Sequence, residues 1–159
     1  MQTQQAEILG VYELVSRYGY LLDQDRLEEW VDLFSAESSY KVISRENEAL
    51  GLPAPMIWCD NKHMIQDRIA SYRDVNEYNL HWPRRIVGIP LIEERNPSGS
   101  IKVVASYSLF QTDLEGRTRL FSVGRYEFEV LAQSEGFLLG DVLVVADTSL
   151  IQTLLAAPI

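Results

Sequence analysis

The chain of 159 residues carries a formal net charge of −9, and its 47% hydrophobic and 23% charged residues are typical of a soluble globular protein. This length predicts one domain over residues 1–159, which can bury roughly 70% of its unfolded surface without help from disulfides or metals. The acidic balance argues against nucleic acid and anionic membranes as partners, because both attract basic surfaces.

The sequence also predicts a cytoplasmic location. Its single cysteine, Cys59, excludes an internal disulfide and suits a reducing compartment. The first residues lack the basic stretch and continuous apolar run of a signal peptide. No apolar run approaches the roughly 20 residues of a membrane span.

The first part of the chain has helical periodicity. Apolar residues recur at three- and four-residue spacing from about residue 4 to residue 22, which predicts a first helix. Residues 27–34 predict a second, shorter helix, with Asp23 or Asp25 expected to cap its start. Its predicted apolar face consists of Leu27, Trp30, Val31 and Phe34.

The middle of the chain connects this helical half to a sheet half. Residues 40–44 are β-formers and predict a strand, whereas the glycine and prolines in residues 45–55 predict a loop. A short strand from Ile57 should end at Asp60, which we expect to cap a third helix. The apolar stripe of that helix is Ile65, Ile69, Tyr72 and Val75. A loop should then lead into the next strand.

The rest of the chain predicts a meander of long strands. Residues 84–95 are apolar on both alternating faces, so a strand there should be buried on both. Turn signals at 96–99, 113–116 and 133–136 separate strands over 101–112, 118–131 and 137–147. The residues expected to face inward are Ile101, Val103, Ala105, Tyr107, Leu109, Leu120, Tyr126, Phe128 and Val130.

These elements together predict the fold class. Helices first and a long antiparallel meander afterwards give an α+β arrangement. Strands this long must twist and coil, so we expect N-terminal helices packed in a strongly curved, mainly antiparallel sheet that forms a cone with an inner cavity. The apolar closing segment, residues 147–159, should pack either on the domain's own sheet or on another subunit.

The chain lacks most of the chemistry that iron and zinc sites need. Two histidines and one cysteine cannot ligate a Rieske cluster, which needs two of each. His63 and His81 with a carboxylate could hold iron in principle, but His63 is better placed to pair with Asp67 one helical turn away. Phosphate-binding loops and nucleophile elbows are absent from the sequence, and Cys59 is expected to be a buried structural residue.

One cluster remains with two interpretations. His81, Trp82, Arg84 and Arg85 fall within five residues. Arginine and tryptophan are enriched at the energetic centres of protein interfaces, so we favour a subunit contact surface. In the alternative, His81 and an aspartate brought close by the fold act as an acid/base pair in the cone.

The order and spacing of short motifs resemble the small (β) subunit of bacterial aromatic-ring-hydroxylating dioxygenases over nearly the whole chain. In the first half these motifs are Leu22-Asp23, Glu29-Trp30, Leu33-Phe34, Tyr40, Arg45-Glu46-Asn47 and Gly51-Leu52-Pro53. In the second half they are Asp67-Arg68-Ile69, His81, Arg84, Gly88-Ile89-Pro90, Gly124-x-Tyr126, Asp147-Thr148 and Leu154-Leu155-Ala156-x-Pro158.

The resemblance implies a cone-shaped α+β domain, like nuclear transport factor two and its SnoaL-type relatives. It implies that the subunit is structural and non-catalytic, and that it joins a large α subunit and other β subunits in an α3β3 hexamer. The α subunit of this family carries the [2Fe-2S] Rieske cluster and a mononuclear Fe(II), and the β subunit carries no cofactor.

One motif departs from the family. Similar members often read His-x-x-Arg-His where this chain reads His81-Trp82-Pro83-Arg84-Arg85. Proline removes a backbone donor and restrains Trp82 to extended conformations, so the local contact to a partner should differ. The regions around Arg45 and His81 are most similar to systems that hydroxylate aromatic carboxylates.

The sequence therefore favours a structural dioxygenase subunit. Two hypotheses of other classes remain beside it: a stand-alone cone-fold isomerase, dehydratase or cyclase that uses His81, and a homodimeric binder of small ligands.

Overall fold

The computed structural model describes residues 2–75 and 80–159, so the loop predicted before the third strand partly lies outside the described residues. Its helices are α1 (Gln2–Asp23), α2 (Leu27–Asp32), α3 (Arg45–Ala49) and α4 (Lys62–Asp74). Its first strands are β1 (Tyr40–Ser44), β2 (Ile57–Cys59), β3 (His81–Val87) and β4 (Leu91–Arg95). The long strands are β5 (Ser100–Asp113), β6 (Thr118–Ala132) and β7 (Phe137–Ala146).

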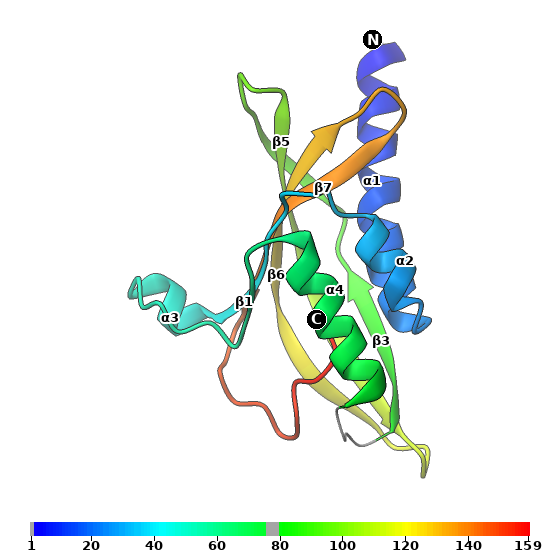
Figure 1. Cartoon of the computed structure of the whole chain (residues 1–159), viewed down its shortest axis with the longest axis vertical. Coiled ribbons are helices and arrows are strands. Elements are labelled where there is room, and N and C mark those ends of the chain that lie inside the picture. The colour runs from blue at the N-terminus through cyan, green and yellow to red at the C-terminus, as the bar shows by residue number, and fades with distance from the viewer. Residues whose placement is uncertain (1, 76–79) are drawn as a thin grey trace.

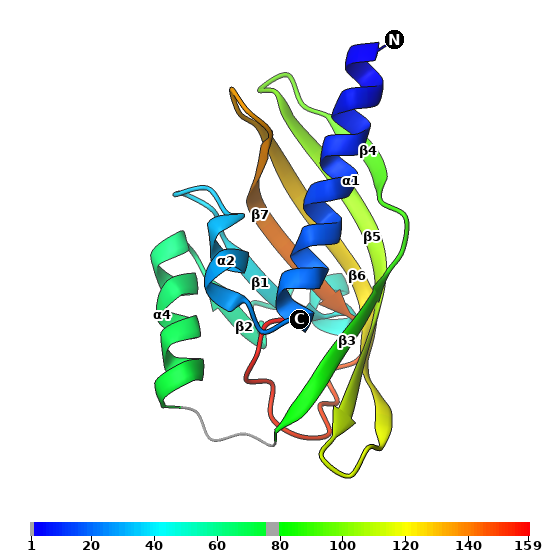
Figure 2. The same ribbon diagram turned by 90° about the vertical axis from the view of Figure 1, so that its right-hand side faces the viewer.

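The strands form one sheet in the order β2-β1-β7-β6-β5-β3, with β4 also paired to β5. All its pairings are antiparallel except that of β1 with β7. The sheet curves around α1 and α2, which lie on its concave face (Figures 1 and 2). The predicted α+β cone is confirmed.

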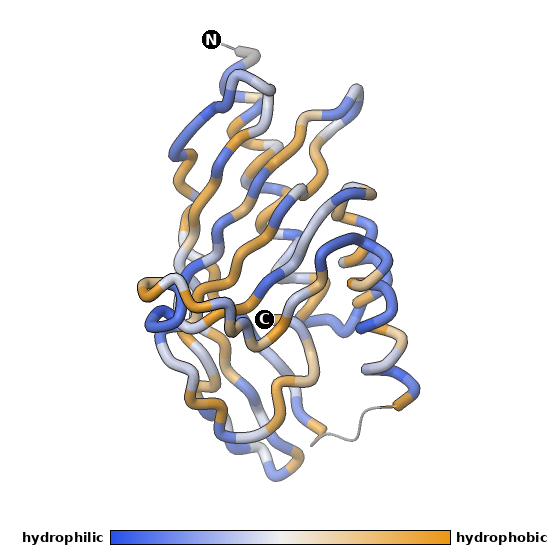
Figure 3. The backbone as a smooth tube through the Cα atoms, turned by 60° about the vertical axis from the view of Figure 1, so that its left-hand side comes forward, coloured by the Kyte–Doolittle hydropathy of each residue, from blue (hydrophilic) through white to orange (hydrophobic). Residues whose placement is uncertain are grey.

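Tyr18 of α1 is the centre of the core. Its ring makes edge contacts with Trp30, Tyr126 and Phe128, at centroid distances of 5.7, 5.2 and 5.1 Å. The predicted faces of the first two helices are therefore confirmed as core. Along the sheet, apolar and polar residues alternate as the period of two requires (Figure 3).

The predicted strand over 84–95, buried on both faces, is wrong. Two strands, β3 and β4, occupy this stretch, and most of their residues are exposed or half-buried. These strands are exposed because β3 is the last strand of the sheet order, and no strand in the described chain pairs with its other side. Pro83, which cannot donate to a ladder, fits such an edge.

The prediction that Leu120 faces inward is also wrong. Leu109 pairs with Ser122 but Phe110 pairs with Leu120, so Phe121 is the extra residue of a β-bulge. The bulge reverses the alternation, and Leu120 is 50% exposed. The other residues predicted to face inward on β5 and β6 are buried.

Residues 45–49, predicted to be loop, form the short helix α3. The Ser44 side chain accepts a hydrogen bond from the Asn47 amide and caps its first turn. Gly51 and the prolines follow the helix rather than prevent it. Helix α3 and the segment to Pro55 project from the body (Figure 1), and we call residues 45–55 the α3 arm.

The N-cap predictions for two helices are wrong, although the observed N-caps lie close to the predicted residues in the sequence. Asn61, not Asp60, caps α4 by accepting from the Met64 amide at 2.9 Å. Neither Asp23 nor Asp25 caps α2, because Arg26 occupies the N-cap position. In α4, Ile65, Ile69 and Tyr72 are buried as predicted, but Val75, at the helix end, is 75% exposed.

The predicted turns after β4, β5 and β6 are confirmed. In the last of them the Gln133 amide donates to the Gly136 carbonyl at 3.0 Å, and Gly136 has a φ of 78° that favours glycine. No helix in residues 2–75 and 80–159 is long and apolar enough to cross a membrane.

Candidate functional site

The most polar group in the interior is an ion pair between α1 and β3. Arg85 Nη1 lies 2.6 Å from Asp23 Oδ1, and the Arg85 amide donates to Asp23 Oδ2 at 2.7 Å. Their side chains are only 2% and 6% exposed. Asp23 ends α1, and Arg85 lies on the concave side of β3 opposite Leu109. The Arg85 side chain therefore lies inside the chain, where Asp23 neutralises its charge, and not on the exposed side of β3.

The final segment, residues 155–159, contacts this pair through Arg85, and we call it the tail. Figure 2 shows the C-terminus near the end of α1. Tyr18 Oη donates to the Ile159 carbonyl at 2.7 Å, and Arg85 Nη2 donates to the Pro158 carbonyl at 2.6 Å. The Ile159 amide donates to Tyr40 Oη at 2.9 Å. Ile159 is completely buried. Of the two predictions for the closing segment, packing within the same chain is confirmed, although Leu150 and Leu154 remain exposed.

Burial of the interior tyrosines shifts their titration. It raises the pKa of Tyr18, Tyr40 and Tyr126 above the ordinary phenol value, and that of Tyr107 to about 12. All these hydroxyls stay neutral at physiological pH, so they act as hydrogen-bonding groups rather than as bases.

The predicted inner cavity of the cone is largely closed. A space of about 20 Å³ remains among Pro83, Arg85, Leu109 and the tail. A single water molecule needs at least about 10–15 Å³, so this space is too small for an organic substrate. The tail has taken the volume that the cone shape would otherwise leave open.

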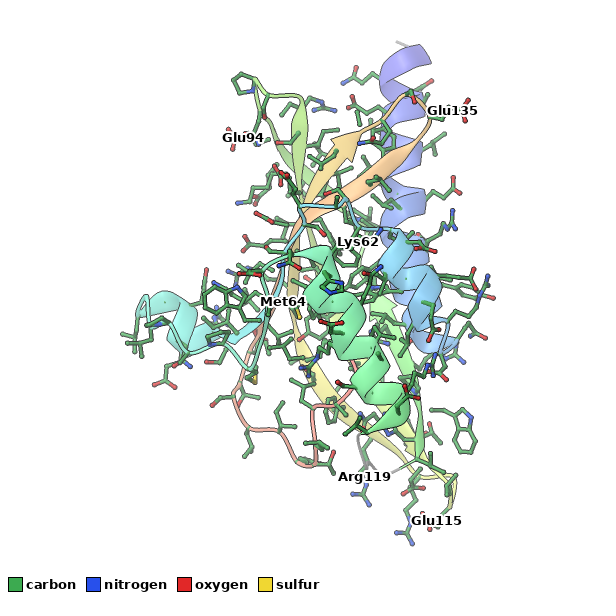
Figure 4. The ribbon with its side chains drawn as sticks, viewed as in Figure 1. Lys62, Met64, Glu94, Glu115, Arg119 and Glu135 are labelled. Carbon is green, nitrogen blue, oxygen red and sulfur yellow. The ribbon has the colours of Figure 1, made fainter. Side chains whose placement is uncertain are left out.

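A larger cavity, of about 770 Å³, lies between the β5–β6 hairpin and residues 152–154, which precede the tail. Its lining includes His81, Asp113, Arg119 and Leu154. Figure 4 shows Glu115 and Arg119 at this end of the molecule, in the region of the β5–β6 hairpin. Here His81, which lies in strand β3 and not in a loop, is opposite Asp113 in the β3–β5 register. Asp113 Oδ1 also accepts from the Arg117 amide at 2.8 Å and so fixes the hairpin turn.

The outer side of β3 is a different surface. Trp82 and Ile86 are 59% and 63% exposed, and Arg84 lies between them. The register places Arg84 beside Phe110 and Phe110 beside Leu120. We call these five residues the outer β3 surface. It combines exposed apolar side chains with an arginine, which is the composition of an interface centre.

The α3 arm exposes a second apolar group. Leu50 and Leu52 are 65% and 45% exposed, and Trp58 on the adjacent β2 is 58% exposed. Lys41 lies over the Trp58 ring, 5.6 Å from its centroid. Because β2 is the other end of the sheet order, the molecule has one exposed apolar surface at each edge.

The remaining predicted residues have structural positions. His63 Nε2 lies 3.9 Å from Asp67 Oδ2 on the exposed side of α4, which confirms the predicted pair. Cys59 is buried, and burial raises the pKa of its thiol, which confirms the structural assignment. In the part of the chain that the structure describes, no three His, Cys, Asp or Glu side chains are grouped to hold a metal.

Sequence reasoning missed the interior polar network. The predictions of Asp23 as a helix cap and of Arg85 as part of a contact surface do not connect these two residues. A usable signal existed: Tyr18, Tyr107 and Tyr126 all fall on predicted inward faces, and their hydroxyls would need partners there.

Comparison with known proteins gives a consistent result. A family model described as the ring hydroxylating beta subunit matches residues 17–153. The small subunit of anthranilate 1,2-dioxygenase from Burkholderia cepacia is 35% identical over 150 residues, which are 94% of this chain and 92% of that protein. Subunit beta 1 of the terephthalate 1,2-dioxygenase terminal oxygenase from Comamonas is 28% identical over 142 residues, covering 89% and 92%.

A solved structure from Novosphingobium aromaticivorans superposes on the whole chain. It is assigned as the β subunit of an aromatic-ring-hydroxylating dioxygenase. The TM-score is 0.88 at 35% sequence identity, and the match covers 100% of both chains.

Proposed function

The chain belongs to the ring-hydroxylating β-subunit family, and we propose that it is the structural, non-catalytic small subunit of an aromatic-ring-hydroxylating dioxygenase. The observation that carries this proposal is the match over residues 17–153 together with a tail that fills the cone.

The partner is the large α subunit, in an α3β3 assembly that also contains the other β subunits. The [2Fe-2S] Rieske cluster and the mononuclear Fe(II) belong to the α subunit. Two histidines and one cysteine in this sequence do not fit a Rieske cluster, since it needs two of each. In addition, His63 is exposed beside Asp67 whereas Cys59 is buried, so these two side chains do not form a shared ligand set.

The substrate of the assembled enzyme is an aromatic carboxylate. The names of the two relatives, anthranilate and terephthalate dioxygenases, support this class. The choice among such substrates would be made in the α subunit, where the ring is hydroxylated.

The contact surface for the α subunit is the outer β3 surface, with His81 at its margin. The exposed fractions of Trp82 and Ile86 and the presence of Arg84 support this assignment. The α3 arm provides a second contact. We place residues 1–159 in the cytoplasm as one domain of this assembly.

Co-expression with the large subunit tests the proposal. The two chains should co-purify at about 1:1 in an assembly much larger than a monomer, and iron and sulfide should be found in that complex. An active dimer of this chain without a partner would contradict the proposal.

The His81→Ala variant separates the subunit from a stand-alone enzyme. His81 is paired with Asp113 in the β3–β5 register, and both residues line the open cavity, so this is the pair that an acid/base mechanism would use. For a structural subunit, ring hydroxylation by the assembled variant should stay within a few-fold of wild type. A loss of about 10²-fold or more with normal assembly would support general acid–base catalysis by His81.

A further inference from the structure

The interior of the cone is more polar than a purely structural core needs to be. Buried ion pairs contribute little net stability, and apolar residues of similar volume often replace them without loss. Nevertheless Asp23 and Arg85 lie almost fully buried beside the hydroxyls of Tyr18 and Tyr40. Such groups are the usual means of binding and orienting a polar ligand.

The tail is bound by these groups in the manner of a ligand. Side chains of four different elements reach its backbone: Tyr18 from α1, Tyr40 from β1, Arg68 from α4 and Arg85 from β3. Tyr18, Arg68 and Arg85 donate to the carbonyls of Ile159, Leu155 and Pro158 respectively, and Tyr40 Oη accepts from the Ile159 amide. The donors therefore recognise peptide carbonyls rather than particular side chains.

The connection of the tail to the sheet is exposed and irregular. Residues 147–153 are outside helices and strands, and Leu150 within them is 73% exposed. Beyond this segment, Ala156, Pro158 and Ile159 are buried again. The tail is thus an apolar peptide on a solvent-exposed tether.

The site holds more polar groups than the tail uses. Within the described residues, Arg68 Nε is buried without a hydrogen-bond partner, and the buried hydroxyl of Tyr126 lies close to Arg85. Arg85 also lines the residual space of about 20 Å³ beside the tail. Buried polar atoms are rarely left unpaired in a structural core, so the unpaired Arg68 Nε indicates a site whose ligand can vary.

We propose that the interior of the cone is a binding site for a short apolar peptide segment, which residues 155–159 occupy in cis. The ligand it takes is an extended segment with small apolar side chains and carbonyls for Tyr18 and Arg85. An equivalent segment from another copy of this chain, or a free peptide of the same sequence, can replace the tail. This site lies on the opposite face of β3 from Trp82, Arg84 and Ile86 of the outer β3 surface.

A nicked form of the full chain tests the proposal. A protease site inserted after Leu150, in the exposed tether, allows the tail to be cut from the sheet while every residue stays present. A fluorescent peptide with the sequence of residues 151–159 is then added in excess without denaturant. The labelled peptide should replace the tail at 1:1 and faster than the protein unfolds globally.

Two controls define the site. A peptide in which the residue equivalent to Ile159 is aspartate should not exchange, because that side chain is completely buried. Tyr40→Phe in the nicked chain should lower peptide affinity about tenfold, whereas Tyr20→Phe, at a residue 54% exposed, should not change it.

Exchange that occurs only at the rate of global unfolding would overturn the proposal. So would aggregation of the nicked chain when its tail leaves, since either result makes the tail an ordinary part of the core. The experiment uses this chain alone, so its failure leaves co-purification with the α subunit unaffected.

Discussion

At the scale of single residues, the Asp23–Arg85 pair gives the sharpest prediction. Arg85→Met leaves the Asp23 carboxylate buried without a counter-charge, and losing one partner of such a pair costs about 3–5 kcal/mol. Urea unfolding of the isolated chain measures this loss. Arg26→Ala, which breaks an exposed pair with Glu29, should leave the midpoint nearly unchanged.

A double variant shows whether the loss comes from the unpaired charge. Asp23→Leu combined with Arg85→Met should recover most of the stability, because no charge then remains buried. If both single variants were as stable as wild type, the pair would not be buried as described.

The buried tyrosines predict loss of stability at alkaline pH. An unfolded tyrosine titrates near pH 10, and burial raises the pKa of Tyr107 to about 12 and that of Tyr126 further in the same direction. Between these pKa values the unfolded chain has lost protons that the folded chain keeps. Stability is therefore full below about pH 10 and falls by about 1.4 kcal/mol per pH unit for each such tyrosine above it.

Denaturant unfolding at several pH values between 8 and 11.5 measures this slope. Tyr126→Phe should reduce this slope by the contribution of one proton, because phenylalanine has no hydroxyl to titrate. An unchanged slope in this variant would contradict the burial of its ring.

The pairing of side chains that are distant in the sequence was the feature least predictable from the sequence. Arg85 lies 62 positions from Asp23, and no local pattern connects them. Only the fold decides that one arginine of HWPRR points inward while Arg84, beside it, points outward. By contrast, the local pair His63–Asp67 followed directly from helical spacing.

At the scale of elements, the helix cap of α4 can be tested directly. Asn61→Ala removes the acceptor for the Met64 amide and should cost about 1 kcal/mol. Asp60→Ala should cost clearly less, because its carboxylate accepts from the Asn61 side chain and not from the helix backbone. Thermal unfolding of both variants compares them, and the reverse order would restore Asp60 as the cap.

Element existence was predictable where periodicity is long. The first helix and the strands β5 and β6 each repeat their pattern over many residues, and their positions were confirmed. Helix α3 was missed because a single side-chain cap at Ser44 outweighs the glycine and prolines that follow it. Leu120 was misplaced because a bulge inserts one residue without a clear sequence signal.

At the scale of the whole molecule, the exposed apolar surfaces at the two edges of the sheet predict which substitutions should weaken assembly with the α subunit. Ile86→Asp places a charge in the outer β3 surface, and Leu50→Asp places one on the α3 arm. Each should reduce recovery of the complex with the α subunit about tenfold or more, because a charge in an interface centre must be desolvated. Co-purification measures the recovered complex.

Leu9→Asp is the matched control for both variants. Leu9 is 67% exposed, close to the 63% of Ile86, but it lies on α1 and belongs neither to the outer β3 surface nor to the α3 arm. It should assemble normally. Equal loss in all three variants would point to general destabilisation, and no loss in any would place the contact elsewhere.

The cone-shaped fold was predictable from the sequence, but the packing of the closing segment inside it was not. Long alternating strands after helices require a curved sheet around a helix, and this was confirmed. The composition of the closing segment is compatible with packing on the domain's own sheet and with packing on another subunit, because an apolar segment can be buried in either place. What decides between them is a set of polar partners spread over four elements, which composition does not reveal.

The bond from Tyr18 to Ile159 also fixes when the molecule can finish folding. These residues are 141 positions apart, so the helix that begins the chain waits for its partner until Ile159 has been synthesised. Until then the Asp23–Arg85 pair and the interior hydroxyls are open to water on the side that the tail later covers. Contacts of such sequence separation form late and slowly. Docking of the tail should therefore be a late step of folding, and it should form together with the bond from Tyr18 to Ile159.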